Sequence, residues 1–307
     1  MNTTDMKIPS NRVSDIRRYC HAQLRDLYPA GEVEAMTRML FEAFLGWNLT
    51  QLMLHGEDTI NQSDLLKFHW AVEDLKRYRP IQHIIGYVDF CDCRINVSPD
   101  ALIPRPETEE IIHRVIDYGK ELCNTIAANS SVPRILDLCS GSGCMAIALA
   151  HALPQAKVTA VELSDKALSL ARQNAEQNKV DIEFVQADIL DTASTINLLR
   201  ATAAEKFCII VSNPPYIAES ESAMMQRNVT DYEPEMALYV PDSDPLLFYR
   251  AIARLSDEMM LREGFVALEI NERFGNETAA LFSEHGYSSQ LQKDFRDKDR
   301  MLICRHR

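Results

Sequence analysis

The chain has 307 residues, of which 46% are hydrophobic, and this is enough for one large domain or two ordinary ones. Its formal net charge of -13 disfavours direct binding to nucleic acid, because such binding normally needs a basic surface. The opening residues MNTTDMKIPSNRVSD contain no apolar signal core, and no apolar run of about 18 residues could span a bilayer. We therefore expect a cytoplasmic protein without membrane contact.

The cysteines do not have the spacing of a metal-binding framework. The chain has 8 of them, scattered mostly in apolar segments and without paired CxxC motifs, so we interpret them as reduced and structural. Cys91 and Cys93 form the only close pair, and strand alternation would place both on one face. This is weak support for a metal site, and we expect no metal ion.

Residues 1–80 predict a small helical bundle. Apolar side chains recur at helical spacing in three stretches, which begin at Val13, Val33 and Leu65. Residues 81–100 predict a linking β-hairpin instead, with short β-like runs at 83–85 and 94–97. The prolines of the next segment, Pro104 and Pro106, predict an extended approach to a helix that starts at residue 107 or 108.

Beyond Val132 the chain alternates strands and helices. Strands are predicted at 134–138, 157–162, 182–186, 207–211, 265–270 and 301–304, and the clearest helices at 145–151 and 165–178. This alternation indicates an α/β fold with a doubly wound, mostly parallel sheet and helices on both faces. Ligands of such sheets bind at the carboxyl ends of the strands.

The first of these strands runs directly into a glycine loop, Cys139-Ser140-Gly141-Ser142-Gly143. Its glycines permit a tight turn and close approach of a ligand to free amides at a helix N-terminus. The P-loop pattern is absent, and Ala146 stands where the dinucleotide fingerprint allows alanine. The loop alone fits a dinucleotide enzyme and an S-adenosylmethionine methyltransferase equally, and it also fits a loop that merely turns tightly.

Acidic residues follow the next two strands. Glu162 ends the strand 157–162, about twenty positions after the loop, where a carboxylate suits both hydroxyls of a ribose. Asp188 follows the strand 182–186 and can hydrogen-bond an adenine amino group, although an isolated Asp at a strand end is more often a helix cap.

The strand 207–211 ends in Ser212-Asn213-Pro214-Pro215-Tyr216, which should open onto the same crevice. A planar amide or amine nitrogen is a poor nucleophile and must be positioned to react. Asn213 offers a side-chain carbonyl, Pro214 a backbone carbonyl and Tyr216 a ring for stacking, while the two prolines limit backbone freedom. A hydride-transfer enzyme has no evident use for this arrangement, and an ordinary proline turn is the remaining alternative.

The asparagine-proline-proline-tyrosine turn behind the glycine loop resembles that of the amino methyltransferases, which modify adenine, guanine or glutamine. The segments IPRPETE at 103–109 and PIQHIIG at 80–86, with the helical N-terminal residues, resemble the PrmC/HemK family of protein-(glutamine-N5) methyltransferases. This family acts on the GGQ glutamine of class I peptide chain release factors. The resemblance covers essentially the whole chain and continues at 232–238, 244–250 and 297–300.

The resemblance implies a Rossmann-like class I methyltransferase domain at 101–307 behind a substrate-recognition domain at 1–80 and the hairpin at 81–100. The residues implied to hold S-adenosylmethionine, which becomes S-adenosylhomocysteine, are Asp137, Cys139, Ser140, Gly141, Ser142, Gly143, Glu162, Asp188, Ile189 and Asn213. The residues implied to hold the glutamine and position it for reaction are Asn213, Pro214, Pro215 and Tyr216, with Arg105 and Glu107 close by.

The sequence departs from the family pattern at two places. Family members usually have threonine or alanine and glycine where this chain has Cys139-Ser140, a tolerable change because backbone amides make the contacts. After Glu269 many members have a glycine and then a glutamine, whereas this chain reads Ile270-Asn271-Glu272-Arg273-Phe274-Gly275, to which we assign no role beyond a structural one.

We therefore expect a monomeric, metal-independent enzyme that methylates a release-factor glutamine by in-line transfer from S-adenosylmethionine. No histidine is placed to act as a base, and we interpret His83 and His151 as structural. The alternatives are a glutamine methyltransferase of a ribosomal protein, a nucleic-acid amino methyltransferase, and a cofactor-binding module without catalysis.

Overall fold

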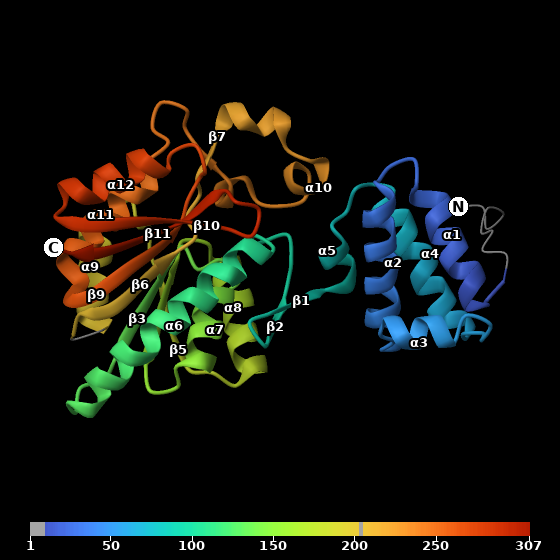
Figure 1. Ribbon diagram of the computed structural model, residues 1–307, viewed down its shortest axis with the longest axis horizontal. Coiled ribbons are helices and arrows are strands. Elements are labelled where there is room, and N and C mark those ends of the chain that lie inside the picture. The colour runs from blue at the N-terminus through green and yellow to red at the C-terminus, as the bar shows by residue number, and fades with distance from the viewer. Residues whose placement is uncertain (1–9, 203–204) are drawn as a thin grey trace. The chain divides into compact units, whose positions relative to one another are not determined.

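The computed structural model describes residues 10–202 and 205–307, so most of the opening stretch that lacks a signal core, residues 1–9, lies outside the described part. The chain divides into two compact units, labelled by element in Figure 1. One unit is the chain up to Gly86 with Arg227–Tyr232, and the other is Tyr87–Gln226 with Glu233–Arg307. No helix among the described residues is long and apolar enough to cross a membrane.

The first unit is helical. Its helices are α1 (Val13–Leu24), α2 (Ala30–Leu45), α3 (Leu49–Leu54), α4 (Gln62–Leu75), α5 (Ile81–Ile85) and α10 (Arg227–Thr230). Asparagine side chains cap α3 and α4, since Asn48 and Asn61 accept the amides of Gln51 and Asp64. The apolar stripes meet in one core, in which the rings of Phe41 and Phe68 lie 4.5 Å apart.

The β-like run predicted at 83–85 is wrong, because these residues belong to α5. Pro80 precedes the helix and Gly86, with φ of 93°, ends it in the left-handed conformation. Ile81 is buried in the helical core and Ile84 packs against it, so the turn is held by tertiary contacts. A run of five residues is too short for its periodicity to distinguish a helix from a strand.

The second unit begins with a two-stranded antiparallel hairpin, β1 (Tyr87–Phe90) and β2 (Cys93–Asn96). The hairpin joins the main body through β2, where the amide of Asn96 donates to the side chain of Asn174 at 2.9 Å. Asn174 is fully buried and also donates to the carbonyls of Asn96 and Ser142. It therefore ties the hairpin to the glycine loop.

A seven-stranded sheet forms the body of the second unit, in the order β10-β11-β9-β6-β3-β4-β5. Five neighbouring strands are parallel, and β11 runs antiparallel to both β9 and β10. Their bounds are β3 (Arg134–Leu138), β4 (Lys157–Glu162), β5 (Ile182–Gln186), β6 (Phe207–Ser212), β9 (Met260–Glu269), β10 (Tyr287–Lys293) and β11 (Asp299–His306). The sequence did not predict β10, and β9 begins five residues before its predicted start.

Helices cover both faces of this sheet (Figure 1). One face packs on α6 (Pro106–Ala128), α7 (Cys144–Ala152) and α8 (Asp165–Asn178), the other on α9 (Thr192–Thr202), α11 (Leu247–Met259) and α12 (Gly275–Glu284). Along β3 the side chain of Ile135 enters the first layer and that of Leu136 the second. The doubly wound α/β fold predicted from the sequence is confirmed.

A short excursion follows β6. It contains the parallel pair β7 (Ile217–Ala218) and β8 (Tyr239–Val240) and the 3-10 turns η2 (Glu219–Met224) and η3 (Glu235–Ala237). Residues from its second half, Pro234, Met236 and Ala237, return to the carboxyl edge of the sheet and line the cavity described next.

Candidate active site

An open cavity lies at the carboxyl ends of β3, β4, β5 and β6, with an empty volume of about 930 Å³ that includes its mouth. The four strands end side by side, so residues far apart in the sequence meet there. The wall contains most of the predicted site residues, namely Arg105, Cys139, Ser140, Gly141, Ser142, Glu162, Asp188, Ile189, Asn213 and Pro215.

The glycine loop needs its glycines for two different reasons. Gly141 (φ 55°) and Gly143 (φ 79°) both have left-handed backbones, which an L side chain rarely adopts. A Cβ at Gly141 would meet no described atom within 4 Å, so the backbone there faces open space. A Cβ at Gly143 would lie 3.0 Å from Cβ of Ala171, so this glycine allows α7 and α8 to pack closely.

The Glu162 carboxylate is held by three backbone amides. Its Oε2 accepts from Gly141 at 2.8 Å, and its Oε1 accepts from Leu163 and Ser164 at 2.9 Å each. A carboxylate has about four acceptor positions, so one position, on Oε2, remains. Glu162 can accept one hydroxyl as it stands, and gripping both hydroxyls of a ribose requires release of a backbone bond.

Three buried polar atoms beneath the loop lack a hydrogen-bond partner among the described residues: Oδ1 of Asp137 and the hydroxyls of Ser140 and Ser142. The other carboxylate oxygen of Asp137 accepts the amide of Ala146 at 3.1 Å. Burial raises the pKa of Asp137 to about 7, while the nearby Ser140 hydroxyl and the Ala146 amide oppose the rise and the charge of Glu162 adds to it. Unpaired buried polar atoms are rare, so this cluster fits the polar end of a bound cofactor.

Four side chains joined by hydrogen bonds form a network along the floor of the site. The amide nitrogen of Asn213 donates to the Thr108 hydroxyl at 3.2 Å, and this hydroxyl donates to Oε2 of Glu269 at 2.6 Å. The Tyr216 hydroxyl donates to the other oxygen, Oε1, at 2.8 Å. Thr108 and Glu269 are both 2% exposed, so water does not compete for these bonds.

The donor-to-acceptor direction of this hydrogen-bond network sets the orientation of the Asn213 amide. The Thr108 hydroxyl has a single proton, which it donates to Glu269. The Thr108 oxygen must then accept from Asn213, which turns the Asn213 carbonyl away from Thr108. No described donor is bonded to that carbonyl, and Asn213 lines the cavity, so the site presents a fixed acceptor.

Burial also acts on the two acidic groups of this network, the Glu269 carboxyl and the Tyr216 phenol. It raises the pKa of Glu269 above its ordinary range, while hydrogen bonds from Thr108 and Tyr216 oppose that rise. Burial is likewise the first cause that raises the pKa of Tyr216, followed by the nearby charge of Glu269. The phenol therefore remains a donor at neutral pH, so the direction of the hydrogen bonds in the network does not change.

Five other predicted residues do not line the cavity: Asp137, Gly143, Pro214, Tyr216 and Glu107. Glu107 forms an ion pair with Arg296 at 3.3 Å. Tyr216 is half-buried and uses its hydroxyl on Glu269, so a stacking role for its ring stays a prediction. The roles assigned to the other four from the sequence also stay predictions.

Several residues that organise the site were not predicted from the sequence. Glu233, with a side chain 1% exposed, accepts from Arg105 at 2.5 Å and from the amide of Ile103 at 3.0 Å, and so holds the IPRPETE segment. Asn271 donates to the carbonyl of Tyr216 at 3.0 Å and thereby anchors the proline turn. Thr108 and Glu269 complete the set, and Glu269 had one signal, an acid at the carboxyl end of a sheet strand.

Comparison with known proteins gives matches over both units. Residues 15–86 match the family described as PrmC N-terminal domain, and residues 112–232 match Methyltransferase small domain. Among solved structures, a methyltransferase from Pyrococcus furiosus aligns with 68% of this chain and 87% of its own at 19% identity and a TM-score of 0.45, too remote a likeness to inform function.

Curated relatives match along nearly the full length. A release factor glutamine methyltransferase of Flavobacterium psychrophilum is 38% identical over 280 residues, which cover 91% of this chain and 94% of the relative. That of Bacteroides thetaiotaomicron is 36% identical over 290 residues, which cover 94% and 98%. The expectation drawn from the IPRPETE segment and the proline turn is thereby confirmed, and the chain belongs to the release factor glutamine methyltransferase family.

Proposed function

We propose that this protein methylates the side-chain amide nitrogen, N5, of the GGQ glutamine in class I peptide chain release factors. One observation supports this most strongly. The hydrogen bonds from Asn213 to Thr108 and from Thr108 to Glu269 fix a carbonyl acceptor at a cavity that is also lined by the glycine loop. A fixed acceptor of this kind suits a planar NH₂ group, and the relatives named above are glutamine methyltransferases.

The donor of the methyl group is S-adenosylmethionine, which supplies a methyl on a positively charged sulfur. The glycine loop, the spare acceptor position of Glu162 and the exposed carboxylate of Asp188 are the groups that would hold its ribose and adenine. The unpaired polar atoms of Asp137, Ser140 and Ser142 fit its amino-acid end. Each oxygen of this set can accept from a hydroxyl or an ammonium group.

The substrate amide requires acceptors for both of its N–H groups. Asn213 offers its side-chain carbonyl, and the backbone carbonyl of Pro214 is a second acceptor to which no described residue donates. Holding the amide by both hydrogens directs the nitrogen lone pair toward an incoming methyl group. Positioning of this kind can lower the activation barrier of an enzyme reaction by a large amount.

Proton release needs no dedicated base. An amide nitrogen becomes strongly acidic as it is alkylated, so its proton can pass to water or to Asn213. No histidine is found among the residues that line the cavity. The residues around the nitrogen therefore position the substrate amide and accept hydrogen bonds from it, and they do not have to titrate near neutral pH.

The helical unit is proposed to recognise the release factor, since residues 15–86 match the PrmC N-terminal domain. A release-factor substrate would place the enzyme in the cytoplasm. The expectations of a monomer and of no direct nucleic-acid contact stay predictions, the latter supported by the net charge of -13.

The test is incubation of the purified protein with methyl-labelled S-adenosylmethionine and a class I release factor, in parallel with a variant in which alanine replaces the GGQ glutamine. We expect label in the release factor and none in the variant. Label in both proteins, or label that appears only in added ribosomal protein or RNA, would contradict the proposed substrate and support one of the alternative methyl acceptors.

A further inference from the structure

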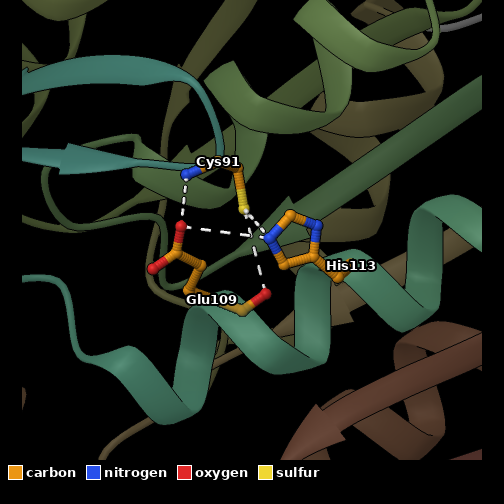
Figure 2. A group of neighbouring side chains, drawn as sticks. All are labelled: Cys91, Glu109 and His113. Carbon is orange, nitrogen blue, oxygen red and sulfur yellow. Dashed lines mark hydrogen bonds and ion pairs between the residues drawn. The ribbon is translucent and has the colours of Figure 1, made fainter.

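Three side chains of metal-ligand type converge outside the cavity, where the turn of the β1–β2 hairpin meets α6 (Figure 2). They are Cys91, in the turn, and Glu109 and His113, one helical turn apart on the same face of α6. One ligand atom from each lies within 4.8 Å of the others. All three belong to the same compact unit, and none lines the cavity.

The distances are close to those of a metal site. Sγ of Cys91 lies 3.9 Å from Nε2 of His113, and this nitrogen lies 3.9 Å from Oε1 of Glu109. In a tetrahedral zinc site, with bonds of roughly 2.0 to 2.3 Å, the ligand atoms are about 3.5 Å apart. The two distances to His113 must therefore shorten by about half an ångström, which its side chain, 58% exposed, is free to supply. The gap between the Cys91 sulfur and the Glu109 carboxylate, at most 4.8 Å, must close by up to about 1.3 Å.

The rest of the cluster is already ordered without a metal. Oε1 of Glu109 accepts the amide of Cys91 at 2.8 Å, which fixes the carboxylate beside the turn. Cys91 is 6% exposed, and Figure 2 shows its sulfur directed toward the helix rather than toward solvent. Cys93, its neighbour in the sequence pair, does not take part in the cluster.

We propose that Cys91, Glu109 and His113 bind one zinc ion, with a water molecule in the fourth position. The thiol gives its proton to solvent as the metal binds. A thiolate with an imidazole selects zinc over magnesium or calcium, which prefer oxygen ligands. The ion would link the hairpin turn to the first turns of α6, and it lies apart from the methyl-transfer reaction, for which no metal is proposed.

The test uses the full-length protein, stripped of metal and titrated with cobalt(II) as a spectroscopic substitute for zinc. We expect a thiolate-to-cobalt charge-transfer band that saturates at one equivalent and disappears when one equivalent of zinc is added. Zinc at about a hundredfold excess over its dissociation constant should raise the melting temperature by about 5 °C.

Variants separate ligation from packing. Cys91→Ser should abolish the charge-transfer band. His113→Ala removes a direct ligand and should weaken zinc binding by more than the loss of about 10-fold to 100-fold that is typical of residues supporting a ligand. Glu109→Gln keeps an acceptor for the Cys91 amide but removes the charge, and should also weaken binding. Cys93→Ala and His151→Ala serve as matched controls that retain the band, and circular dichroism verifies that each variant is folded.

Three results would overturn the proposal. The first is a wild-type protein that gives no charge-transfer band with cobalt in excess. The second is a folded Cys91→Ser protein that keeps the band, and the third is a control variant that loses the band as completely as Cys91→Ser, since either would place the metal elsewhere.

Discussion

Substitution of Thr108 by valine should disable the active site without unfolding the protein. Valine has nearly the same shape but no hydroxyl, so Glu269 loses the donor at 2.6 Å and Asn213 loses the acceptor at 3.2 Å. A hydrogen bond to a charged group contributes about 1.5 to 3 kcal/mol to stability. We expect the free energy of unfolding to fall by about 2 kcal/mol, which a domain stabilised by 5 to 15 kcal/mol tolerates.

The effect on catalysis follows from the orientation of the Asn213 amide. With threonine present, the reversed amide would point its oxygen at the Thr108 oxygen and lose a hydrogen bond of about 1 kcal/mol. With valine present, the two orientations become similar in energy and the side chain can also move. We expect kcat to fall by about 10-fold to 100-fold, the usual result of small misplacement of a positioning group.

The assay is single-turnover transfer of labelled methyl to a release factor, with cofactor affinity measured by calorimetry. The dissociation constant of S-adenosylmethionine should stay within about threefold of wild type, because no polar contact of the glycine loop is removed. Thr108→Ser is the matched control, since it keeps the hydroxyl, and it should retain most of the activity. A Thr108→Val enzyme with wild-type kcat, or a Thr108→Ser enzyme that is equally impaired, would refute the reasoning.

Three further predictions concern the acids and the glycine loop. Burial raises the pKa of Glu269, so the loss of kcat on acidification should begin at a higher pH than titration of an ordinary glutamate would give. In the Glu269→Gln variant this acid-side fall in kcat should be absent. The pKa of Asp137 is raised from 3.8 to about 7, so the folded protein binds the extra proton between those values and its stability falls as pH rises across them. In urea unfolding, the free energy of unfolding should fall by up to about 4 kcal/mol between pH 4 and pH 8 because of Asp137, and Asp137→Asn should remove this pH dependence. An unchanged pH dependence in the variant would contradict the raised pKa of Asp137. Gly143→Ala combines a left-handed backbone with a contact of 3.0 Å to Ala171 and should cost about 2 kcal/mol of unfolding free energy. Gly141→Ala shares the backbone strain but meets open space, so it should cost less stability and weaken cofactor binding instead.

The fold was largely predictable because the buried strands carry continuous apolar runs with local punctuation. The strand 182–186 and the helix 165–178 have the predicted bounds. The missed strand, β10, reads YSSQLQK and lies at the edge of the sheet, where only Tyr287 is buried. An edge strand exposed on one side needs little apolar character, so its pattern resembles a loop.

The positions of the glycine loop and the proline turn were predictable for a similar reason. Each directly follows a buried strand, and β3 and β6 are adjacent and parallel, so both segments reach the same edge of the sheet. Local sequence therefore places the atoms of Gly141 and Asn213 in one cavity. The same reasoning cannot say which end of the Asn213 amide faces that cavity.

That orientation depends on contacts between residues distant in the sequence. Thr108 and Glu269 are 161 positions apart, and Thr108 and Asn213 are 105 apart. In sequence, Thr108 is one more residue of a helix start and Glu269 one residue near the end of a predicted strand. Only when β9 and α6 pack side by side do a hydroxyl and a carboxylate meet, and the acceptor-only nature of the carboxylate then dictates the direction of each bond. In the proposed function, the Asn213 amide that meets the substrate is thus oriented, through Thr108, by the buried Glu269 carboxyl, which does not line the cavity. Substitution of Thr108 is therefore the decisive test of the site.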